Sequence, residues 1–263
     1  MKFIFAVLVL VVGAMMGSFA CCQVWRMRYK QEGKKALGKW SVCLSCKKRL
    51  NWYDNIPIFS WLLLKGKCRK CGKPIGTMEI LSEIGMMVIY GLLMMYFWPS
   101  LWTGMGMDVL VLCKFIIMLV LMVVMWMLFL YDGKWGEMPT KLLYLAIILA
   151  AIYRGMAGMS NYMSVFGAVL ILAGIYFALY IFSKEKLVGA GDWMLCLAIA
   201  LVLGNWWLAL ITLFLANFLG SIIMLPVAKK TKNHTIHFAP FLITGFLIVF
   251  MLQDFLSGLL SSF

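Results

Sequence analysis

The amino-acid sequence predicts an all-α, polytopic membrane protein with about eight transmembrane helices. Three features of the composition support this fold class. Of the 263 residues, 64% are hydrophobic, the mean hydropathy is +0.96, and only 13% are charged. A soluble domain is nearer half apolar, and so few charged residues would not cover a water-facing surface of ordinary size. The excess apolar residues therefore indicate membrane spans.

Eight stretches have the apolar length that a bilayer crossing requires, which is about 20 residues of helix. The fourth and sixth are short, and Gly204-Asn205 separates the sixth from the seventh. The first stretch resembles a signal peptide, but it runs into Cys-Cys-Gln-Val-Trp-Arg without a small-residue cleavage pattern, which favours a retained span. The predicted spans are 3–25, 80–98, 108–131, 140–156, 162–182, 191–203, 206–226 and 238–258.

Positive charge is concentrated in one segment, which predicts the orientation of the chain. The formal net charge is +14, and 14 of the 24 Lys and Arg residues lie between Arg26 and Lys73. Because Lys and Arg mark the cytoplasmic side of a membrane protein, segment 26–78 is predicted to be cytoplasmic, beside anionic lipid. Nucleic acid is the other usual partner of a basic patch, and it ranks well below lipid because this segment lies between spans.

The remaining loops agree with this orientation. Alternating from segment 26–78 puts loops 132–139, 183–190 and 227–237 inside, and each of them carries Lys. The loops left outside contain no Lys or Arg, and both termini are predicted to lie outside as well. These outside loops are 99–107, 157–161 and 204–205.

Two aspartates lie at the ends of predicted spans, where burying a carboxylate beside lipid costs at least a few kcal/mol and a functional role is expected. Asp132 ends the third span and Asp192 begins the sixth. Two complete spans separate them, so both are predicted at the cytoplasmic boundary. Carboxylates that share a site cannot both ionise easily, so one serves as general acid while the other activates water. The alternative is a pair of ordinary interfacial acids, which Asp132 taken alone favours.

The residues before Asp192 remove side-chain bulk next to its carboxylate. Asp192 closes the sequence Gly189-Ala190-Gly191-Asp192. Glycines at these positions would let an extended peptide backbone approach closely. Because paired carboxylates can hydrolyse a peptide bond without a nucleophilic side chain or a metal, the two aspartates predict a hydrolytic dyad.

Four of the eight cysteines form two Cys-x-x-Cys pairs in the basic segment. Cys43 and Cys46 make the first pair, and Cys68 and Cys71 make the second, with 21 residues between the pairs. Two such pairs can close a tetrahedral thiolate site, so structural zinc is predicted, and the surrounding Lys and Arg favour thiolate. Disulfides are the alternative, which a reducing cytoplasm disfavours. The other four cysteines lie in or beside spans and are predicted to be packing residues.

These motifs occur in an order that resembles the type IV prepilin leader peptidase family over nearly the whole chain. Residues 17–19 are similar to the family's Gly-Ser-Phe motif, and residues 54–62 to its Asp-Asn-Ile-Pro and Ser-Trp-Leu block. Residues 132–139 match its Asp-x6-Pro pattern, and residues 189–192 match its Gly-x-Gly-Asp. Residues 238–242 resemble the opening of its last span. The short cytoplasmic segment resembles the compact members that serve competence pili.

The resemblance implies two activities. One is cleavage of the short basic leader of prepilins and pseudopilins, after a Gly, at the cytoplasmic face of the bacterial inner membrane. The other is methylation of the new N-terminal residue with S-adenosylmethionine, associated with the cysteine-containing segment. The alternatives are a peptidase without methyl transfer and a non-enzymatic, zinc-bearing scaffold or transporter. A transporter tends to place its acids near the membrane midplane, whereas both aspartates here are predicted at one face.

The resemblance also implies three parts of the chain. These are a first transmembrane helix over 1–25, a methyltransferase-associated zinc domain over 26–78, and a seven-helix peptidase core over 79–263. The chain departs from the family pattern at Met194, where the family has Lys.

Two glutamates open the second predicted span, four residues apart on one helix face. Glu79 follows a Pro as in the family's block before this span, which implies contact with the methyl donor or the substrate. Glu83 is interpreted as a complement to the helix dipole. His234 and His237 precede the last span without a third ligand nearby in sequence, which favours a solvated loop over a metal site.

Overall fold

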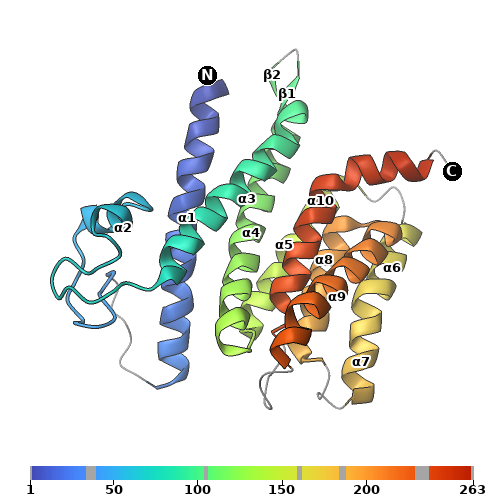
Figure 1. Ribbon diagram of the computed structural model, residues 1–263. Coiled ribbons are helices and arrows are strands. Elements are labelled where there is room, and N and C mark those ends of the chain that lie inside the picture. The colour runs from blue at the N-terminus through green and yellow to red at the C-terminus, as the bar shows by residue number, and fades with distance from the viewer. Residues whose placement is uncertain are drawn as a thin grey trace. The chain divides into compact units, whose positions relative to one another are not determined.

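The computed structural model of the chain is built almost entirely of helices (Figure 1). It describes residues 2–33, 40–103, 106–158, 162–183, 188–228 and 237–261. The chain forms two compact units, Met1–Pro99 (unit 1) and Ser100–Phe263 (unit 2). Each unit has its own packing and its own candidate site.

The order of elements along the chain follows the predicted order of spans. The described residues include one short antiparallel hairpin, in which β1 (Trp102–Thr103) pairs with β2 (Gly106–Met107). The helices are α1 (Lys2–Gln31), the 3-10 helix η1 (Trp52–Asn55), α2 (Phe59–Leu63), α3 (Thr77–Leu101), α4 (Val109–Trp135), α5 (Thr140–Ala157), α6 (Tyr162–Val169), the π-helical turn η2 (Leu170–Gly174), α7 (Ile175–Ser183), α8 (Ala190–Leu203), α9 (Trp206–Ala228) and α10 (Ala239–Ser261).

The predicted fold class is confirmed. Within the described residues, seven helical stretches are long and apolar enough to cross a membrane, and one of them combines α6, η2 and α7. The remaining predicted span, 191–203, is the shorter apolar helix α8. All eight predicted spans are therefore helices, seven of them of full membrane-crossing length.

In unit 1, the long helices α1 and α3 cross at two glycines. Gly13 faces Tyr90, and Gly17 lies against the backbone of Ser82, so a side chain at either glycine would collide with α3. The Ser82 hydroxyl donates a buried hydrogen bond to the Gly17 carbonyl at 2.7 Å. Small residues let apolar helices approach closely within a bilayer. The glycine of the 17–19 motif therefore has a packing role.

In unit 2, the short helix α8 is the central element. It contacts α5, α6, η2, α7, α9 and α10, and five of its residues are fully buried: Leu195, Cys196, Ala198, Ile199 and Ala200. A helix of 14 residues is about 21 Å long, which is shorter than the hydrocarbon core of a bilayer. This length suits α8 because other helices surround it.

The end of α4 and the start of α8 meet at the same end of unit 2. Helix α5 packs against both of them, and so does α10. Gly136 ends α4 in a left-handed conformation, and Gly189 is the N-cap of α8. The connection from α4 to α5 then passes directly over the first turn of α8, where Met138 contacts Gly191.

Two of the predicted cytoplasmic loops are described only in part. Residues 184–187 of loop 183–190 and residues 229–236 of loop 227–237, with His234, lie outside the described residues. His237 is half-buried just before α10, and its Nδ1 atom is shielded from solvent. This differs from the solvated position expected for it.

Candidate functional site

Asp132 lies in the last turn of α4, where it is 4% exposed. Its Oδ2 atom accepts a hydrogen bond of 3.0 Å from the backbone N–H of Ala239, the first residue of α10. The first N–H groups of a helix have no partner within the helix, so this donor is available to a side chain. The bond fixes the orientation of the Asp132 carboxyl group against α10.

Asp192 is the third residue of α8 and is 7% exposed. Its Oδ2 atom accepts a hydrogen bond of 3.0 Å from the backbone N–H of Gly189, which caps the start of the helix. Its Oδ1 atom is buried and has no hydrogen-bond partner in the described part of the chain. Buried carboxylate oxygens normally have a partner, so Oδ1 is suited to hold a proton, a water molecule or a substrate group.

The structure brings the two predicted aspartates together. Asp132 and Asp192 lie 60 positions apart in the sequence, yet their carboxyl groups interact electrostatically within unit 2. Each carboxyl group is held by a backbone N–H at the start of a helix. The result is a buried pair of acids in fixed orientations, close enough for the charge of Asp132 to act on Asp192.

Gly191 is required by a neighbouring segment of the same chain. A Cβ atom at this position would lie 2.6 Å from Cε and 2.9 Å from Cβ of Met138. Met138 belongs to the connection between α4 and α5, so the residues that follow Asp132 pack directly on the Gly-x-Gly-Asp turn. Met138 thus fills the space beside Gly191, which the sequence had suggested for a substrate backbone.

Tyr176 and Asn217 are polar residues near the dyad that no sequence motif revealed. Tyr176 follows the π-helical turn η2, is buried, and interacts electrostatically with Asp192. Its hydroxyl oxygen lies 3.0 Å from Nδ2 of Asn217, which donates to it. Polar groups inside membrane spans need hydrogen-bond partners. The presence of a tyrosine and an asparagine inside predicted spans was therefore the sequence signal that could have identified these two residues.

The four cysteines of the two pairs converge in unit 1. The Sγ atoms of Cys43, Cys46, Cys68 and Cys71 all lie within 4.8 Å of one another, and those of Cys43 and Cys71 are 3.9 Å apart. Tetrahedral zinc with Zn–S bonds of about 2.3 Å requires sulfur–sulfur distances of about 3.8 Å. The cluster therefore fits a closed metal site such as structural zinc.

The two cysteine pairs are held by two backbone turns of the same type. The N–H of Lys47 donates to the Cys43 carbonyl at 2.9 Å, and the N–H of Gly72 donates to the Cys68 carbonyl at 2.8 Å. Lys47 and Gly72 have positive φ angles of 58° and 67°. Glycine adopts this conformation freely, whereas other residues are strained by about 1–2 kcal/mol. The repeated turn directs both thiols of each pair to one point.

The surroundings of the thiols favour a bound cation. The backbone N–H of Lys48 donates to the Cys46 thiol and lowers its pKa. The N–H of Lys73 favours the thiolate of Cys71, but desolvation and the neighbouring thiols outweigh it and raise the pKa of Cys71 to about 11. Thiolates this close repel one another, so a metal ion is needed before all four ionise. Hydrogen bonds from backbone N–H groups, rather than the Lys and Arg charges, therefore favour the thiolate forms of Cys46 and Cys71.

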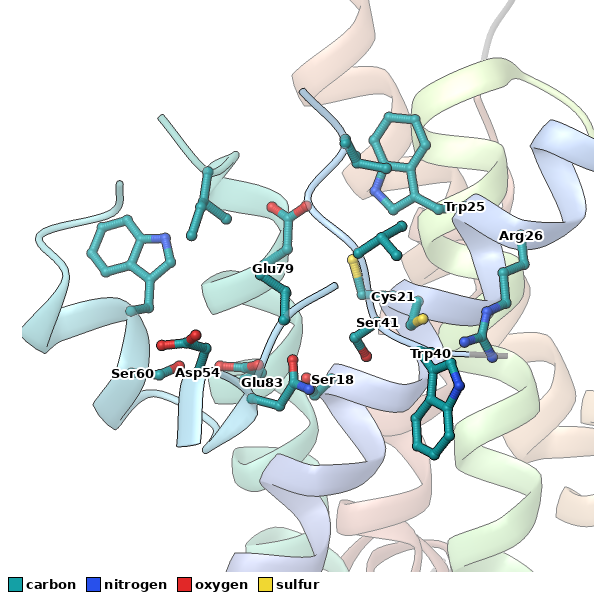
Figure 2. A pocket seen from close by; sticks show the side chains of 17 residues that line it. Ser18, Cys21, Trp25, Arg26, Trp40, Ser41, Asp54, Ser60, Glu79 and Glu83 are labelled. Carbon is teal, nitrogen blue, oxygen red and sulfur yellow. The ribbon is translucent and has the colours of Figure 1, made fainter. Parts of the chain in front are cut away.

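Unit 1 also contains a cavity of about 850 Å³, its open mouth included (Figure 2). It is lined by the cysteine-containing segment and by residues of α1 and α3. Asp54, Glu79 and Glu83 contribute three carboxyl groups to its wall, and Trp25, Trp40 and Trp61 contribute three indole rings. Acidic and aromatic groups around one space suit a ligand that carries positive charge beside flat, apolar parts.

One ion pair joins the cavity to the cysteine cluster. Arg69 lies between Cys68 and Cys71, and its Nε atom donates to Oδ1 of Asp54 at 2.8 Å. The Asp54 side chain is only 4% exposed. A carboxylate with so little access to water depends on its partner. A movement of the turn that contains Cys68 and Cys71 would therefore displace Asp54 in the cavity wall.

Glu79 lies in the first turn of α3 and lines the cavity, as Figure 2 shows. Its Oε2 atom is buried next to Gly76, where an added Cβ would lie 2.9 Å from it. The predicted ligand-contacting residue therefore faces a space that can hold a ligand.

Glu83 holds a strained turn, a role that the sequence did not reveal. Its Oε2 atom accepts the backbone N–H of Ile58 at 2.7 Å, and Ser18 also bonds to this carboxyl group. Ile58 has φ 64° and ψ −54°, and the N–H of Phe59 donates to the Pro57 carbonyl at 2.6 Å. This is a γ-turn with a positive central φ, which is rare and strained, above all for a β-branched residue. Glu83 does more than complement the helix dipole.

Comparison with known proteins follows the same division of the chain. The model of the bacterial peptidase A24 N-terminal domain matches residues 11–97, and that of the type IV leader peptidase family matches residues 119–225. The chain belongs to the type IV leader peptidase family. The first match includes the four cysteines and the cavity, and the second includes Asp132 and Asp192.

Curated members of the family match over most of the chain. A prepilin leader peptidase/N-methyltransferase from Vibrio cholerae serotype O1 is 26% identical over 95% of this chain and 98% of its own length. Proteins with the same name from Pseudomonas putida (26% identical, 93% of this chain and 90% of the relative) and Dichelobacter nodosus (29%, 79% and 69%) are also similar. No solved structure matches the chain significantly.

Proposed function

We propose that this type IV leader peptidase family member cleaves the leaders of prepilins and pseudopilins with Asp132 and Asp192 as its catalytic pair. The observation that carries the proposal is the pair itself, two buried carboxyl groups that interact within unit 2. The name of the curated relatives, prepilin leader peptidase/N-methyltransferase, supports the choice of substrate.

In the proposed reaction the two aspartates share one proton. The ionised carboxylate takes a proton from water, whose oxygen attacks the scissile carbonyl carbon, while the protonated carboxyl group donates its proton to the carbonyl oxygen. The tetrahedral intermediate then collapses and the C–N bond breaks. The amine leaves with the proton that the base took from water, and the carboxylate that had donated its proton takes one back from a hydroxyl group of the intermediate as the carbonyl re-forms. Oδ1 of Asp192 has no hydrogen-bond partner among the described residues and can take part in this transfer, whereas the N–H of Ala239 orients Asp132.

For methyl transfer, we assign the cavity of unit 1 to S-adenosylmethionine, which supplies a methyl group on a positively charged sulfur. The carboxyl groups of Asp54, Glu79 and Glu83 and the three indole rings of the wall suit this charge. Arg26, which also lines the cavity, can bind a carboxylate. Only a neutral amine attacks a methyl group, so Glu79 is the residue that accepts the proton of the new N-terminus.

The four cysteines would hold structural zinc, whose role is to fix the cavity wall. Bound zinc would fix both cysteine turns relative to each other. The second turn carries Arg69, which pairs with Asp54 of the wall at 2.8 Å. The proposed zinc therefore acts on methyl transfer through this ion pair and not on the aspartate dyad.

We place segment 26–78 and the dyad at the cytoplasmic face of the inner membrane, on the basis of the Lys and Arg bias. Cysteine-accessibility labelling in intact cells is expected to find segment 26–78 protected and loop 99–107 accessible. The reverse pattern would put the dyad on the wrong side for a leader with basic residues and would refute this placement.

The test of both activities uses the purified protein and a synthetic prepilin with a basic leader, a Gly-Phe junction and an apolar helix. Asp132→Asn and Asp192→Asn should each abolish cleavage but still methylate a pre-cleaved substrate. Glu79→Gln should cleave normally and fail to methylate. Asp254→Asn, which changes an exposed aspartate near the end of α10, serves as the control with both activities intact.

The possible outcomes separate the alternatives. Normal cleavage by both single Asn variants would refute the dyad. Normal methylation by Glu79→Gln would remove that residue from the transfer step. Cleavage without any methylation by the unaltered chain would leave a peptidase alone, and neither activity would favour a non-enzymatic membrane protein.

A further inference from the structure

The cysteine-containing segment exposes large apolar side chains on one stretch of its surface. Phe59 and Leu63 of α2 are 68% and 81% exposed, and Leu62 of α2 and Trp52 of η1 are exposed as well. Isolated exposed apolar residues are common on any protein, but a group of this size indicates an interaction surface.

The opposite side of α2 is already occupied within unit 1. Ser60 and Trp61 line the cavity, and the Trp61 ring packs so closely on Gly66 that a Cβ there would lie 2.8 Å from it. Helix α2 therefore has two faces, one directed at the cavity and one exposed. The exposed face, with Phe59, Leu62 and Leu63, is available to a partner.

Two contacts define the depth of α2 along α1. Ile58, the N-cap of α2, bonds to Glu83, which also bonds to Ser18 of α1. Lys47 of the first cysteine turn donates to the hydroxyl of Tyr29 at 3.1 Å. Ser18 and Tyr29 are 11 residues apart on α1, which corresponds to about 16 Å.

Helix α2 is thus displaced from the cysteine turns toward the membrane-spanning part of unit 1. Ser18 lies within the predicted span 3–25, whereas Tyr29 lies beyond it. In Figure 1, α2 lies at the level of the middle of α1 rather than at the level of its C-terminal end. On α3, Leu81 is exposed in the turn that precedes Glu83, so apolar surface continues from the spanning helix at this depth.

The residues after α2 are basic. Lys65 and Lys67 are exposed and follow the helix directly. An apolar helix face flanked by lysines is typical of a helix that lies in the plane of a membrane surface, because its apolar side chains reach the acyl boundary while the lysines meet anionic headgroups. A groove for an apolar peptide would not need the flanking lysines.

We propose that α2 lies in the membrane–water interface, with Phe59, Leu62 and Leu63 inserted at the acyl boundary and Lys65 and Lys67 at the headgroups. Its partner is anionic lipid. Lipid on one face of α2 would hold the other face, with Ser60 and Trp61, against the cavity. The proposal stands on exposure, depth and charge, and it does not depend on either enzymatic activity.

The test places a photoreactive benzoylphenylalanine in the full-length protein, reconstituted in nanodiscs of phosphatidylethanolamine and phosphatidylglycerol. Positions 59 and 63 are the test positions. Val88, an exposed residue of the spanning helix α3, is the positive control, and Lys48 beside the first cysteine turn is the aqueous control. Intact mass verifies that each variant contains the photoreactive residue, and a zinc content equal to that of the unaltered chain verifies that the segment is folded.

We expect lipid adducts at positions 59 and 63 in yields comparable with that at position 88. At position 48, the aqueous control, we expect no lipid adduct. Absence of lipid adducts at both test positions, with a normal yield at Val88, would overturn the proposal. Replacement of the lipid adducts by a peptide adduct after addition of a prepilin would also overturn it, in favour of a peptide-binding surface.

Discussion

Removal of the Glu83 carboxyl group should disable the methyl-donor cavity while peptide cleavage continues. The bond from Ile58 to Glu83 is 2.7 Å long, and a hydrogen bond to a charged group contributes about 1.5–3 kcal/mol. The positive φ of Ile58 costs about 1–3 kcal/mol. Because the two energies are of similar size, Glu83→Ala should let the turn relax and move Ser60 and Trp61 out of the cavity wall.

The expected result is a tenfold to hundredfold higher KM for S-adenosylmethionine, which is about 1.4–2.8 kcal/mol. The kcat for methyl transfer should change less, because Glu79 is still present. The assay is methyl incorporation into a pre-cleaved substrate at varied donor concentration, with prepilin cleavage measured in the same preparation. Glu32→Ala is the control, since Glu32 belongs to a surface ion pair with Arg28 that contributes about 0–1 kcal/mol.

A second substitution tests whether Glu83 acts through the turn. Glycine adopts a positive φ without strain, so Ile58→Gly in the Glu83→Ala background should recover about tenfold of the lost affinity, in line with the 1–2 kcal/mol of left-handed strain that it removes. An unchanged KM in Glu83→Ala would refute the reasoning, and so would a double variant no better than the single one.

Three further predictions concern the packing of Gly191, the ion pair between Arg69 and Asp54, and the zinc site. Gly191→Ala should abolish cleavage, because its Cβ would lie 2.6 Å from Cε and 2.9 Å from Cβ of Met138. Met138→Gly in the same chain, which removes both atoms, should restore part of the activity; full activity of Gly191→Ala alone would contradict this packing. Arg69→Ala should reduce methyl incorporation but not cleavage, because it leaves the nearly buried Asp54 carboxylate unpaired at a cost of about 1–3 kcal/mol; equal loss of both activities would argue against a local effect. Elemental analysis should find about one zinc per chain, Cys68→Ser should lose it and impair methylation more than cleavage, and a metal-free preparation with full activity would exclude the zinc site.

The membrane spans could be predicted from the sequence because each is a local property of about 20 consecutive residues. The same holds for the cysteine pairs, since a Cys-x-x-Cys spacing already places two thiols in one turn. The two aspartates required one more step, the counting of spans between them. That step is reliable because a chain that crosses a bilayer twice returns to the same face.

The central position of α8 could not be predicted in this way. Its 14 residues are apolar, but composition does not distinguish a helix surrounded by lipid from one surrounded by other helices, since both environments are apolar. Only the packing of five neighbouring helices and η2 around α8 shows that Asp192 stands at the start of a central helix.

The groups that hold the site residues in place were equally hidden. Ala239 donates to Asp132 across 107 positions of sequence, and Ile58 donates to Glu83 across 25. Both donors are backbone N–H groups, which every residue except proline carries, so no residue type in the sequence marks them. The sequence shows Glu83 only as an acidic residue near the start of a helix, a position that the helix dipole is sufficient to explain.

The sequence by itself determined which residues could carry chemistry. The predicted acid–base chemistry and metal binding require carboxylates or thiols, and these side chains can be read directly from the sequence. It also determined the order of the apolar helices, through the length of each apolar run. The tertiary structure alone decided which backbone groups orient the dyad, why Gly191 must lack a side chain, and that α2 exposes one face while the other lines the cavity. These features arise from close approach between distant segments, and a distance between segments has no counterpart in the linear pattern of the chain.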